Sequence, residues 1–556
     1  MKHRIIKSLN HSVIHPMIQS LNDSLVRNTM KRPLVIIVRD GWGKNPDPKW
    51  NHANAIYLAK HPVQDRLLAE YPGTLIHTSG FDVGLPEGTM GNSEVGHQNI
   101  GAGRIVDQES VAITKQIRNG TFYDNVELNA AVTNALEKKS NLHLFGIVSD
   151  AGVHGLLEHL YGCLILCKKR GLDRVFLHAF TDGRDTSPNS GIEYIRQIEA
   201  KMKEIGVGKV ATVSGRYWAM DRDHRWGRVE KAYRAITAAE GPMFESASAA
   251  IEYYYNHPIE PNMSGDEFVT PSIIRSSSGA PIAIVRDGDS ILFYNYRGDR
   301  PRELTKAFVE ADFKGFTRNE QLKVHFTTMT AYESGLPVHV AYPKPPKMIN
   351  IMADLVSKKN LKQFRCAETE KFPHVTFFFN DYREDPFPGE DRQIVPSPKL
   401  LPTGGPLTTY DQMPEMSAYG ICDQVVTRID SNLYDLMVVN FANCDMVGHT
   451  GVLQAAVRAV EHVDICVGRI LEALARQGGS AIVTADHGNC EQMIDPATGG
   501  PHTAHTTFDV ELFVVDDRFK GKKLNSGGRL ADIAPTALAM MGLDVPAEMT
   551  GKSLIG

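Results

Sequence analysis

Aspartate and histidine residues follow three apolar, strand-like segments of this chain. The segment PLVIIVRDGWG contains Asp40, LMVVNFANCDMVGHTG contains Asp445 and His449, and SAIVTADHGN contains Asp486 and His487. In an open parallel sheet, ligands bind beyond the carboxyl ends of the strands, so these side chains are expected to converge although they are far apart in sequence. Carboxylate oxygens and imidazole nitrogens are suitable ligands for Mn²⁺ or Zn²⁺. The pattern predicts a metal site at the end of a sheet.

Two further features concern the site around Asp445. Asp445 and His449 are four residues apart, so a helix after the strand would carry both on one side. The later segment PHTAHTT contains His502 and His505 in a polar, threonine-rich stretch, where a role in an apolar core is implausible. We expect one of the two to complete a metal site with Asp445 and His449.

Ser93 is the candidate nucleophile. It lies in the glycine-rich segment EGTMGNSEVGHQNIGAGR, on a loop expected to open a helix, where backbone amides and the helix dipole can bind a phosphoryl oxygen. Coordination to a divalent cation lowers the pKa of a hydroxyl, and Asp40, Asp486 and His487 could hold such a cation. The alternatives are that Ser93 is an ordinary N-cap and that His487 only caps a helix.

Arginines follow three strand-like segments in the middle of the chain, RVFLHAFTD, KVATVSGRY and SILFYNYRGD. Guanidinium groups bind phosphate and carboxylate oxygens bidentately, so this set predicts a site for a small polyanion. The alternative is that the arginines lie in solvated surface loops, balanced by Asp182, Asp221, Asp223 and Asp299. The charged residues of these loops are Arg184 and Asp185, Arg216 and Arg222, and Arg297 and Arg300.

His154 and Lys371 extend these two groups. His154 follows the segment IVSDAGV on the same predicted edge as the arginines, and it can form a hydrogen bond or transfer a proton. Lys371 precedes HVTFFFN, which we expect to be a strand, and it can reach a transferred phosphoryl group from the metal-binding part of the chain. Taken alone, each would be interpreted as a surface residue.

The elements that must position these residues alternate as in α/β proteins. Apolar strand-like runs alternate with helix-like stretches over residues 31–106, 107–346 and 347–556. Because Asp40 precedes the middle block while Asp445 follows it, a single metal cluster requires the first and third blocks to fold together. The middle block is then an inserted domain, and its two borders are the expected hinges.

Composition narrows the class of protein. A chain of 556 residues with 42% hydrophobic content can bury at least two cores. A formal net charge of -5 with scattered Lys and Arg argues against a nucleic-acid partner, and no apolar run reaches the roughly 20 residues of a membrane span. The 7 cysteines are widely spaced and include no CxxC pair, which indicates reduced thiols in a cytoplasmic protein.

Three segments are expected to lack regular structure. Residues 253–272 and 381–414 are rich in Pro, Gly and Asp, which is typical of loops. Residues 1–30 are predicted to be a disordered extension. The alternatives for this extension are a transit peptide, for which the signal is weak, and an upstream start codon, because Met30 immediately precedes the first strand.

Several long blocks of the sequence resemble the cofactor-independent phosphoglycerate mutase family. The resemblance covers residues 33–556, and it implies an alkaline-phosphatase-like α/β domain that binds two Mn²⁺ ions and is interrupted by an α/β transferase domain. It also implies interconversion of 3-phosphoglycerate and 2-phosphoglycerate in glycolysis and gluconeogenesis, through a phosphoserine and without 2,3-bisphosphoglycerate. The blocks are DGWG, MGNSEVGHQNIGAGR, HAFTDGRDTSP, GRYWAMDRD, RGDRPRE, AETEKFPHVTFFFN, NFANCDMVGHTG and TADHGN.

Carried over motif by motif, the resemblance implies two metal sites and a set of substrate contacts. One metal site consists of Asp445, His449 and His505, which leaves His502 as a neighbour; the other consists of Asp40, Ser93, Asp486 and His487. Ser93 would attack the phosphoryl group while Lys371 neutralises developing charge, and Asp185 would exchange protons with the glycerate hydroxyls. The implied substrate contacts are His154, Arg184, Asp185, Arg216, Arg222, Arg297, Arg300 and Lys371.

The resemblance further implies a monomer whose domains close to keep water from the phosphoserine. The sequence departs from the family pattern in three places. Arg39 stands where the family usually has an apolar residue, the N-terminal extension is unusual, and the loop around LLPTGGPLTTYDQMP is longer than in short bacterial members. None of these departures removes a ligand.

Related metal enzymes are the main alternative. A phosphatase, a sulfatase or a phosphopentomutase would share the aspartate and histidine ligands but would not need the residues matched in the middle domain. A protein that only senses phosphoglycerate would be expected to have lost Ser93 or a metal ligand, and all of these are present.

Overall fold

The computed structural model describes residues 33–556, which form two compact units. Unit 1 comprises residues 33–107 and 347–556, and unit 2 comprises residues 108–346. The sequence predicts borders after residues 106 and 346, and the units divide after residues 107 and 346. The predicted extension, residues 1–30, lies outside the described residues. Within the described range, no helix combines the length and the apolar character needed to cross a membrane.

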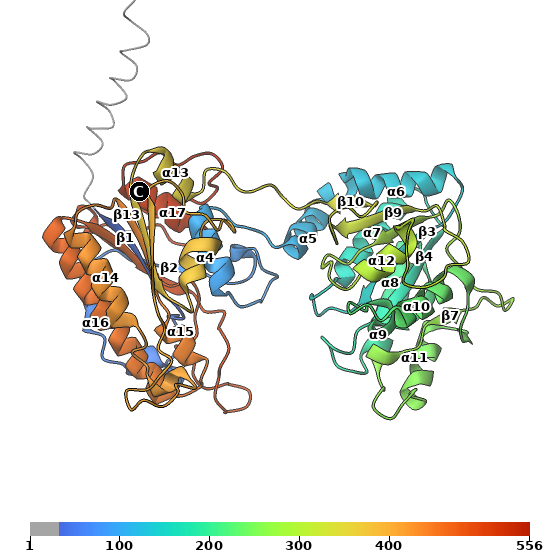
Figure 1. Cartoon of the computed structure of the whole chain (residues 1–556), viewed down its shortest axis with the longest axis horizontal. Coiled ribbons are helices and arrows are strands. Elements are labelled where there is room, and N and C mark those ends of the chain that lie inside the picture. Colours follow the sequence, from blue (N-terminus) through green and yellow to red (C-terminus); the bar gives the residue numbers. More distant parts are fainter. Residues whose placement is uncertain (1–32) are drawn as a thin grey trace, which may run out of the picture. The chain divides into compact units, whose positions relative to one another are not determined.

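Unit 1 contains an eight-stranded sheet in the order β12-β11-β13-β1-β14-β15-β2-β16 (Figure 1). Neighbouring strands are parallel except for β15, which is antiparallel to β14 and β2, so the predicted parallel sheet is mixed at this end. Residues 485–509 connect β14 to β15 without a helix; they form no crossover, and the chain returns antiparallel. The strands are β1 (Leu34–Arg39), β2 (Gly73–His77), β11 (Gln363–Glu368), β12 (Glu390–Val395), β13 (Leu436–Phe441), β14 (Ser480–Thr484), β15 (Val510–Val515) and β16 (Gly528–Arg529).

Strand β1 lies inside the sheet and is buried along its whole length. It pairs in parallel with β13 on one side and β14 on the other, and Val38 is level with Asn440 and Thr484. A strand covered on both faces is a continuous apolar run, as LVIIV is. Because the three strands end at the same edge of the sheet, the loops that follow them leave the sheet together. The predicted metal ligands are in these loops.

Helices cover both faces of the sheet of unit 1 (Figure 1). On one face, α14 packs against α16, and α2 and α3 lie beside α16; on the other face, α4 contacts α13 and α17. Most buried apolar residues of unit 1 belong to one cluster. The helices are α2 (Ala55–Leu58), α3 (Pro62–Glu70), α4 (Ser93–Ala102), α13 (Met352–Lys358), α14 (Ala418–Asp430), α15 (Asn443–Gly448), α16 (Leu453–Gln477) and α17 (Ile533–Met540).

The segment HVTFFFN is helical, and the prediction of a strand is wrong. His374–Phe378 form a short π-helix, η5, which packs against α4. Aromatic and β-branched residues favour strands, but contacts in the folded protein override this preference here. The two predicted loops are only partly irregular, because 381–414 contains β12 and 253–272 begins inside α11 (Ala247–Asn256).

Unit 2 contains a second eight-stranded sheet, in the order β10-β9-β8-β3-β4-β5-β7-β6, in which only β5 and β7 pair antiparallel. Its helices enclose two apolar clusters, one with α6, α7, α8 and α11 and the other with α9, α10 and α12. The strands are β3 (Leu142–Val148), β4 (Val175–Thr181), β5 (Lys209–Gly215), β6 (Met243–Phe244), β7 (Ser272–Ile274), β8 (Ser290–Phe293), β9 (His325–Thr330) and β10 (His339–Tyr342). The helices are α5 (Glu109–Asn119), α6 (Val126–Glu137), α7 (Leu157–Lys169), α8 (Gly191–Ile205), α9 (Arg216–Ala219), α10 (Trp226–Ala238), α11 and α12 (Arg302–Val309).

The close packing of α4 on the residues after η5 makes Gly101 sensitive to substitution. A Cβ atom at this position would lie 2.1 Å from the backbone oxygen of Phe379, so the backbone would have to move. We expect Gly101→Ala to lower the free energy of unfolding by about 1–3 kcal/mol in urea denaturation. The matched control is Gly227→Ala in α10, where a Cβ meets nothing within 4 Å; it should be neutral or stabilise by up to about 1 kcal/mol. Equal effects of the two changes would contradict this account.

Candidate active site

The aspartates and histidines after the central strands of unit 1 converge. In three overlapping groups, the oxygen and nitrogen atoms that could bind a metal lie within 4.8 Å of one another. The aspartates of these groups are at most 2% exposed, so their charges are removed from water and need compensation. The groups are Asp445, His449 and His505; Asp40, Asp445 and His487; and Asp40, His97 and Asp486.

The first group contains the histidine that the residue pattern left open. Asp445 lies in α15, directly after β13, and His449 follows the end of this helix. The Nε2 atoms of His449 and His505 lie 3.1 and 3.0 Å from Asp445 Oδ1. His502 belongs to none of the three groups in the described chain. The geometry therefore favours His505 as the third ligand.

Backbone carbonyls set the orientation of both imidazole rings. His449 Nδ1 donates to Thr503 O at 2.6 Å, and His505 Nδ1 donates to Gly91 O at 2.8 Å. Because carbonyls only accept, both rings carry a proton on Nδ1 and direct Nε2 toward the carboxylate. A histidine whose other nitrogen is held in this way is typical of metal ligands.

Ser93 lies in the first turn of α4, but it is not the N-cap. That position is Asn92, whose side chain accepts a backbone hydrogen bond at 2.9 Å, so the N-cap alternative for Ser93 is wrong. The hydroxyl of Ser93 donates to Asp40 Oδ1 at 3.1 Å and lies 3.0 Å from His487 Nε2. His487 lies in the connection between β14 and β15 and caps no helix of the described chain. The serine hydroxyl is therefore surrounded by the predicted ligands.

Lys371 supplies positive charge to this cluster. Its Nζ donates to Ser93 Oγ at 2.6 Å, to Asp40 Oδ1 at 2.9 Å and to Asp445 Oδ2 at 2.7 Å, and the residue is only 4% exposed. Burial alone would lower the pKa of Lys371, but the carboxylates of Asp40, Asp445 and Asp486 outweigh burial and raise the pKa. Lys371 is therefore a cation next to the candidate nucleophile.

The donor groups around Asp486 and His487 fit a divalent cation. Burial lowers the pKa of His487, but Asp486 and the other carboxylates prevail and raise it to about 10. Asp486 is fully buried, and its Oδ2 lies 3.3 Å from His97 Nδ1, but neither oxygen accepts a hydrogen bond of good geometry from residues 33–556. A buried carboxylate with so little compensation can accept a further partner. With His487 and Ser93 Oγ it forms an oxygen and nitrogen donor set that suits Mn²⁺ or Zn²⁺.

Two residues that the sequence analysis missed hold this cluster in place. His97, one turn after Ser93, donates through Nδ1 to Ser93 O at 2.8 Å and accepts at Nε2 from Asn440 at 3.1 Å. Asn440, in β13, also donates to Asp40 Oδ2 at 2.7 Å, and both residues are fully buried. The spacing of four residues after Ser93 and the polar residue within the apolar strand LMVVNF are the signals that could have found them.

The predicted anion-binding residues of unit 2 also form one cluster, with Arg216 at its buried end. Arg216 is 1% exposed and donates to Asp182 and Asp185 at 2.6 Å each and to His154 Nε2 at 2.9 Å. A guanidinium cannot accept a hydrogen bond, so Nε2 of His154 carries no proton. Burial and the charge of Arg216 lower the pKa of His154 to about 4. His154 is therefore neutral at pH 7, with its proton on Nδ1.

Asp299 connects His154 to two further arginines of this cluster. Asp299 Oδ2 accepts from Arg222 at 2.9 Å, and its Oδ1 lies 3.1 Å from Arg297 Nε and 3.7 Å from His154 Nδ1. Arg222 and Arg297 remain half-exposed. Their guanidinium groups are thus held near the site and keep free surface for a ligand.

Arg184 and Arg300 complete the predicted set. Arg184 pairs with Glu267 at 3.1 Å and is also half-exposed. Arg300 donates to Met220 O at 3.0 Å. Burial, followed by the positive charges of Arg216 and other arginines, lowers the pKa of Arg300. The concentration of positive charge is what an anion-binding site requires.

Arg39, which follows an apolar run and precedes Asp40, is accommodated on the other side of β1. Arg39 is 2% exposed, its Nη1 donates to Gln64 Oε1 at 2.6 Å, and its guanidinium lies 4.3 Å from the ring centre of Trp42. Burial lowers the pKa of Arg39 to about 10, although Glu511 opposes this effect. Because successive side chains of a strand alternate between faces, the arginine does not enter the ligand cluster.

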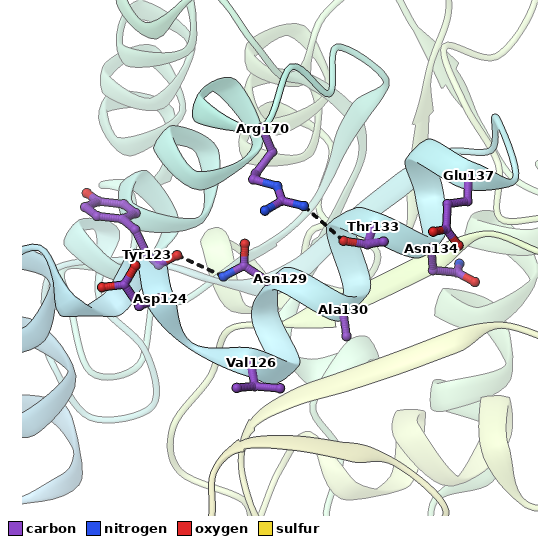
Figure 2. A pocket seen from close by; sticks show the side chains of 9 residues that line it. All are labelled: Tyr123, Asp124, Val126, Asn129, Ala130, Thr133, Asn134, Glu137 and Arg170. Atoms are coloured by element: carbon purple, nitrogen blue, oxygen red, sulfur yellow. Dashed lines mark hydrogen bonds between the residues drawn. The ribbon is translucent and has the colours of Figure 1, made fainter.

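A hollow of about 600 Å³ lies on unit 2, along α6 (Figure 2). Two hydrogen bonds join residues that line it, from Arg170 to Thr133 at 3.2 Å and from Asn129 to the backbone oxygen of Tyr123 at 2.8 Å. None of the candidate site residues lines this hollow. The charged clusters of the two units, and not this hollow, are therefore the candidate functional sites.

Known proteins similar to this chain share nearly its whole length. The family model "BPG-independent PGAM N-terminus" matches residues 113–334. The 2,3-bisphosphoglycerate-independent phosphoglycerate mutase of Rhodopirellula baltica is 57% identical, over 95% of this chain and 98% of that protein. The 2,3-bisphosphoglycerate-independent phosphoglycerate mutase of Clostridium perfringens is 50% identical, over 94% of this chain and 99% of that protein. The crystal structure of Leishmania mexicana phosphoglycerate mutase at low cobalt concentration has a TM-score of 0.53 and 31% identity, and covers 95% of this chain and 98% of that one.

The metal groups predict stabilisation by divalent cations. Mn²⁺ added to metal-free protein at about 100 times its dissociation constant should raise the free energy of unfolding by about 2.7 kcal/mol per site. Thermal unfolding with and without Mn²⁺ measures this gain. His505→Ala should reduce this gain by about 1.4 kcal/mol for each tenfold loss of affinity. His502→Ala is the matched control and should keep the gain. Equal losses in the two variants would exclude His505 as the ligand.

The environment of His154 predicts its titration. Its folded pKa of about 4 lies below the unfolded value of 6.5, so its contribution to stability is complete above pH 6.5 and is lost as the pH falls through 4. Nitrogen NMR of labelled protein should show a neutral ring with its proton on Nδ1 down to about pH 4. Arg216→Met removes the donor and the positive charge, and should raise this pKa. A protonated ring at pH 6 in the unmodified protein would contradict the assignment.

Proposed function

The chain belongs to the family of 2,3-bisphosphoglycerate-independent phosphoglycerate mutases, and we propose that Ser93 is the residue through which it transfers the phosphoryl group. The protein is an isomerase that interconverts 3-phosphoglycerate and 2-phosphoglycerate, a step of glycolysis and gluconeogenesis, through a phosphoserine intermediate. The observation that supports the choice of serine is the position of Ser93 Oγ, 2.6 Å from Lys371 Nζ and 3.1 Å from Asp40.

In the first half of the reaction, Ser93 Oγ attacks the phosphorus of 3-phosphoglycerate. The bond from Oγ to phosphorus forms while the bond from phosphorus to the C3 oxygen breaks, and the hydroxyl proton leaves toward Asp40, its hydrogen-bond acceptor. Lys371 Nζ donates a hydrogen bond to Oγ, and its positive charge neutralises the negative charge that develops on the phosphoryl oxygens. The C3 oxygen takes a proton as it leaves. In the second half, the C2 oxygen of glycerate bonds to phosphorus while the bond from phosphorus to Ser93 Oγ breaks. The C2 hydroxyl loses its proton, Ser93 Oγ recovers one from Asp40, and 2-phosphoglycerate is the product.

Metal ions are required by this enzyme family, and the buried donor groups of unit 1 fit such ions. Divalent cations bound here lower the pKa of the serine hydroxyl and neutralise phosphoryl oxygens. We assign one Mn²⁺ to Asp445, His449 and His505, and a second to Asp40, Ser93, Asp486 and His487. The orphaned oxygens of Asp486 and the fixed Nε2 atoms of His449 and His505 support this assignment.

We assign recognition of the substrate to the cluster of unit 2. Phosphoglycerate carries a carboxylate and a phosphate, and guanidinium groups bind both bidentately. Asp185, which Arg216 holds at 2.6 Å, exchanges protons with the C2 and C3 hydroxyls. The proton of neutral His154 is available for a hydrogen bond. The substrate-binding residues are His154, Arg184, Asp185, Arg216, Arg222, Arg297 and Arg300, together with Lys371 of unit 1.

A phosphatase or sulfatase with the alkaline-phosphatase-like metal domain is the alternative. Such an enzyme needs the groups of unit 1 but not a second unit with a cluster of arginines. A mutase needs such a cluster, because it must hold the glycerate between the two phosphoryl transfers. We also propose that the protein acts in the cytoplasm as a monomer. All 7 cysteines are buried free thiols, and a single chain contains both sets of residues.

The assignment of Ser93 is tested by phosphorus NMR of the purified protein with 3-phosphoglycerate and without 2,3-bisphosphoglycerate. We expect 2-phosphoglycerate to form with Mn²⁺, to stop after chelation, and to form at least about 1,000-fold more slowly in Ser93→Ala. Ser526→Ala, an exposed serine of unit 1, is the matched control and should retain activity. Release of free phosphate instead of 2-phosphoglycerate would support the phosphatase, and full activity of Ser93→Ala would exclude this nucleophile.

A further inference from the structure

Glu491 is a buried carboxylate that takes no part in the chemistry described above. It lies in the loop after β14, four residues beyond His487, and is 0% exposed. Its Oε2 accepts hydrogen bonds from Gly43 N at 3.0 Å and Asn489 N at 2.8 Å, and its Oε1 accepts from Thr506 Oγ1. Two backbone amides and a hydroxyl therefore hold one carboxylate from three directions.

These donors come from two loops that carry predicted metal ligands: the loop after β1, and the connection between β14 and β15, which supplies one donor near each of its ends. Gly43 lies three residues after Asp40, in the loop that follows β1. Asn489 lies two residues after His487, in the loop that follows β14. Thr506 is adjacent to His505, in the segment before β15. The carboxylate of Glu491 thus joins loops that are far apart along the chain.

The surroundings of Glu491 leave it little freedom. A Cβ atom at Gly488 would lie 2.2 Å from Glu491 Oε1, so the loop passes directly over the carboxylate. Gly488 also forms an isolated antiparallel bridge with Thr506, and Cys490 N donates to Gly41 O at 3.1 Å. These contacts hold the two ends of the β14–β15 connection together and join it to the loop after β1, and the carboxylate of Glu491 lies among them.

We infer that Glu491 is a positioning residue for both metal sites, because its carboxylate fixes the loops that present Asp40, His487 and His505. This inference rests on the proposed function, since it requires metal ions at these ligands. The two sites share the loops that Glu491 joins, so loss of its hydrogen bonds should weaken binding at both. Partners that orient ligands in this way typically change metal affinity by about 10- to 100-fold when they are substituted.

The first test is a titration of chelated full-length protein with Mn²⁺, in which electron paramagnetic resonance reports the free ion. We expect Glu491→Gln to weaken Mn²⁺ binding about 10- to 100-fold, since the neutral amide has one acceptor oxygen in place of two and lacks the negative charge that strengthens these hydrogen bonds. At saturating Mn²⁺ the variant should recover most of its turnover, because Glu491 touches no reacting atom. Binding within about twofold of the unmodified protein would overturn the inference.

Glu368→Gln is the matched control. Glu368 is also a fully buried carboxylate of unit 1, and it accepts from Ser397 Oγ at 2.8 Å and from Ser417 N at 3.4 Å; neither donor belongs to the loops that carry Asp40, His487 and His505. The variant Glu368→Gln should leave the affinity for Mn²⁺ unchanged. If thermal unfolding without metal and Mn²⁺ affinity fell equally in both variants, a general loss of stability would explain the effect, and the inference would be wrong.

Thr506→Val is a milder second variant, which tests the inference even if Glu491→Gln does not fold. It keeps the shape of the side chain and removes a single donor to Glu491. We expect weaker Mn²⁺ binding with an unchanged circular dichroism spectrum, and unchanged affinity would overturn the inference. Absence of Mn²⁺ binding in the unmodified protein would overturn the proposed function and this inference together, which distinguishes that failure from failure of the variants alone.

Discussion

The compensation of buried negative charge is the constraint on which unit 1 depends. Asp40, Asp445 and Asp486 are brought together at the ends of β1, β13 and β14, and each is at most 2% exposed. Like charges in a medium of low dielectric repel strongly unless positive charge lies among them. Lys371 and His487 supply part of that charge, and the metal ions proposed for this cluster would complete it. The same charged groups contact the hydroxyl of Ser93, the proposed nucleophile.

Unit 2 has the opposite requirement, since it concentrates positive charge in the cluster that is proposed to bind the anionic substrate. Arg216 is buried and bound to Asp182 and Asp185, whereas Arg222 and Arg297 share Asp299 and remain half-exposed. The buried arginine needs carboxylates to offset the loss of hydration, and the exposed ones keep surface for a ligand. Acidic residues that suggest a solvated loop in the sequence are therefore the counter-ions of the binding cluster.

Precise placement of the reacting groups comes from residues that bear no reacting atom. His97 and Asn440 connect the backbone of Ser93 to Asp40, and Glu491 joins the two loops that carry Asp40, His487 and His505. The close contact of Gly101 with Phe379 brings α4 against η5, near Lys371. Each of these contacts joins segments that are distant in sequence, and rigid supporting contacts of this kind keep a catalytic group within hydrogen-bond reach of its partners.

The sequence by itself determined the chemistry and the strand-end position of the site, because Asp40, Asp445 and Asp486 directly follow apolar runs and the ends of parallel strands share one edge. It also indicated that the first and third blocks form one α/β domain and that the middle block is an inserted α/β domain, since Asp40 and Asp445 flank the middle block. Only the tertiary structure decided that HVTFFFN is helical and that β15 is antiparallel. It also showed that His505, which the family resemblance implied but the residue pattern left open, is the histidine that reaches Asp445. The contacts of Glu491 and His97 likewise emerge only in the tertiary structure. Local composition cannot distinguish chemically equivalent residues, because the distances that separate a ligand from its neighbour arise from contacts between remote segments of the folded chain.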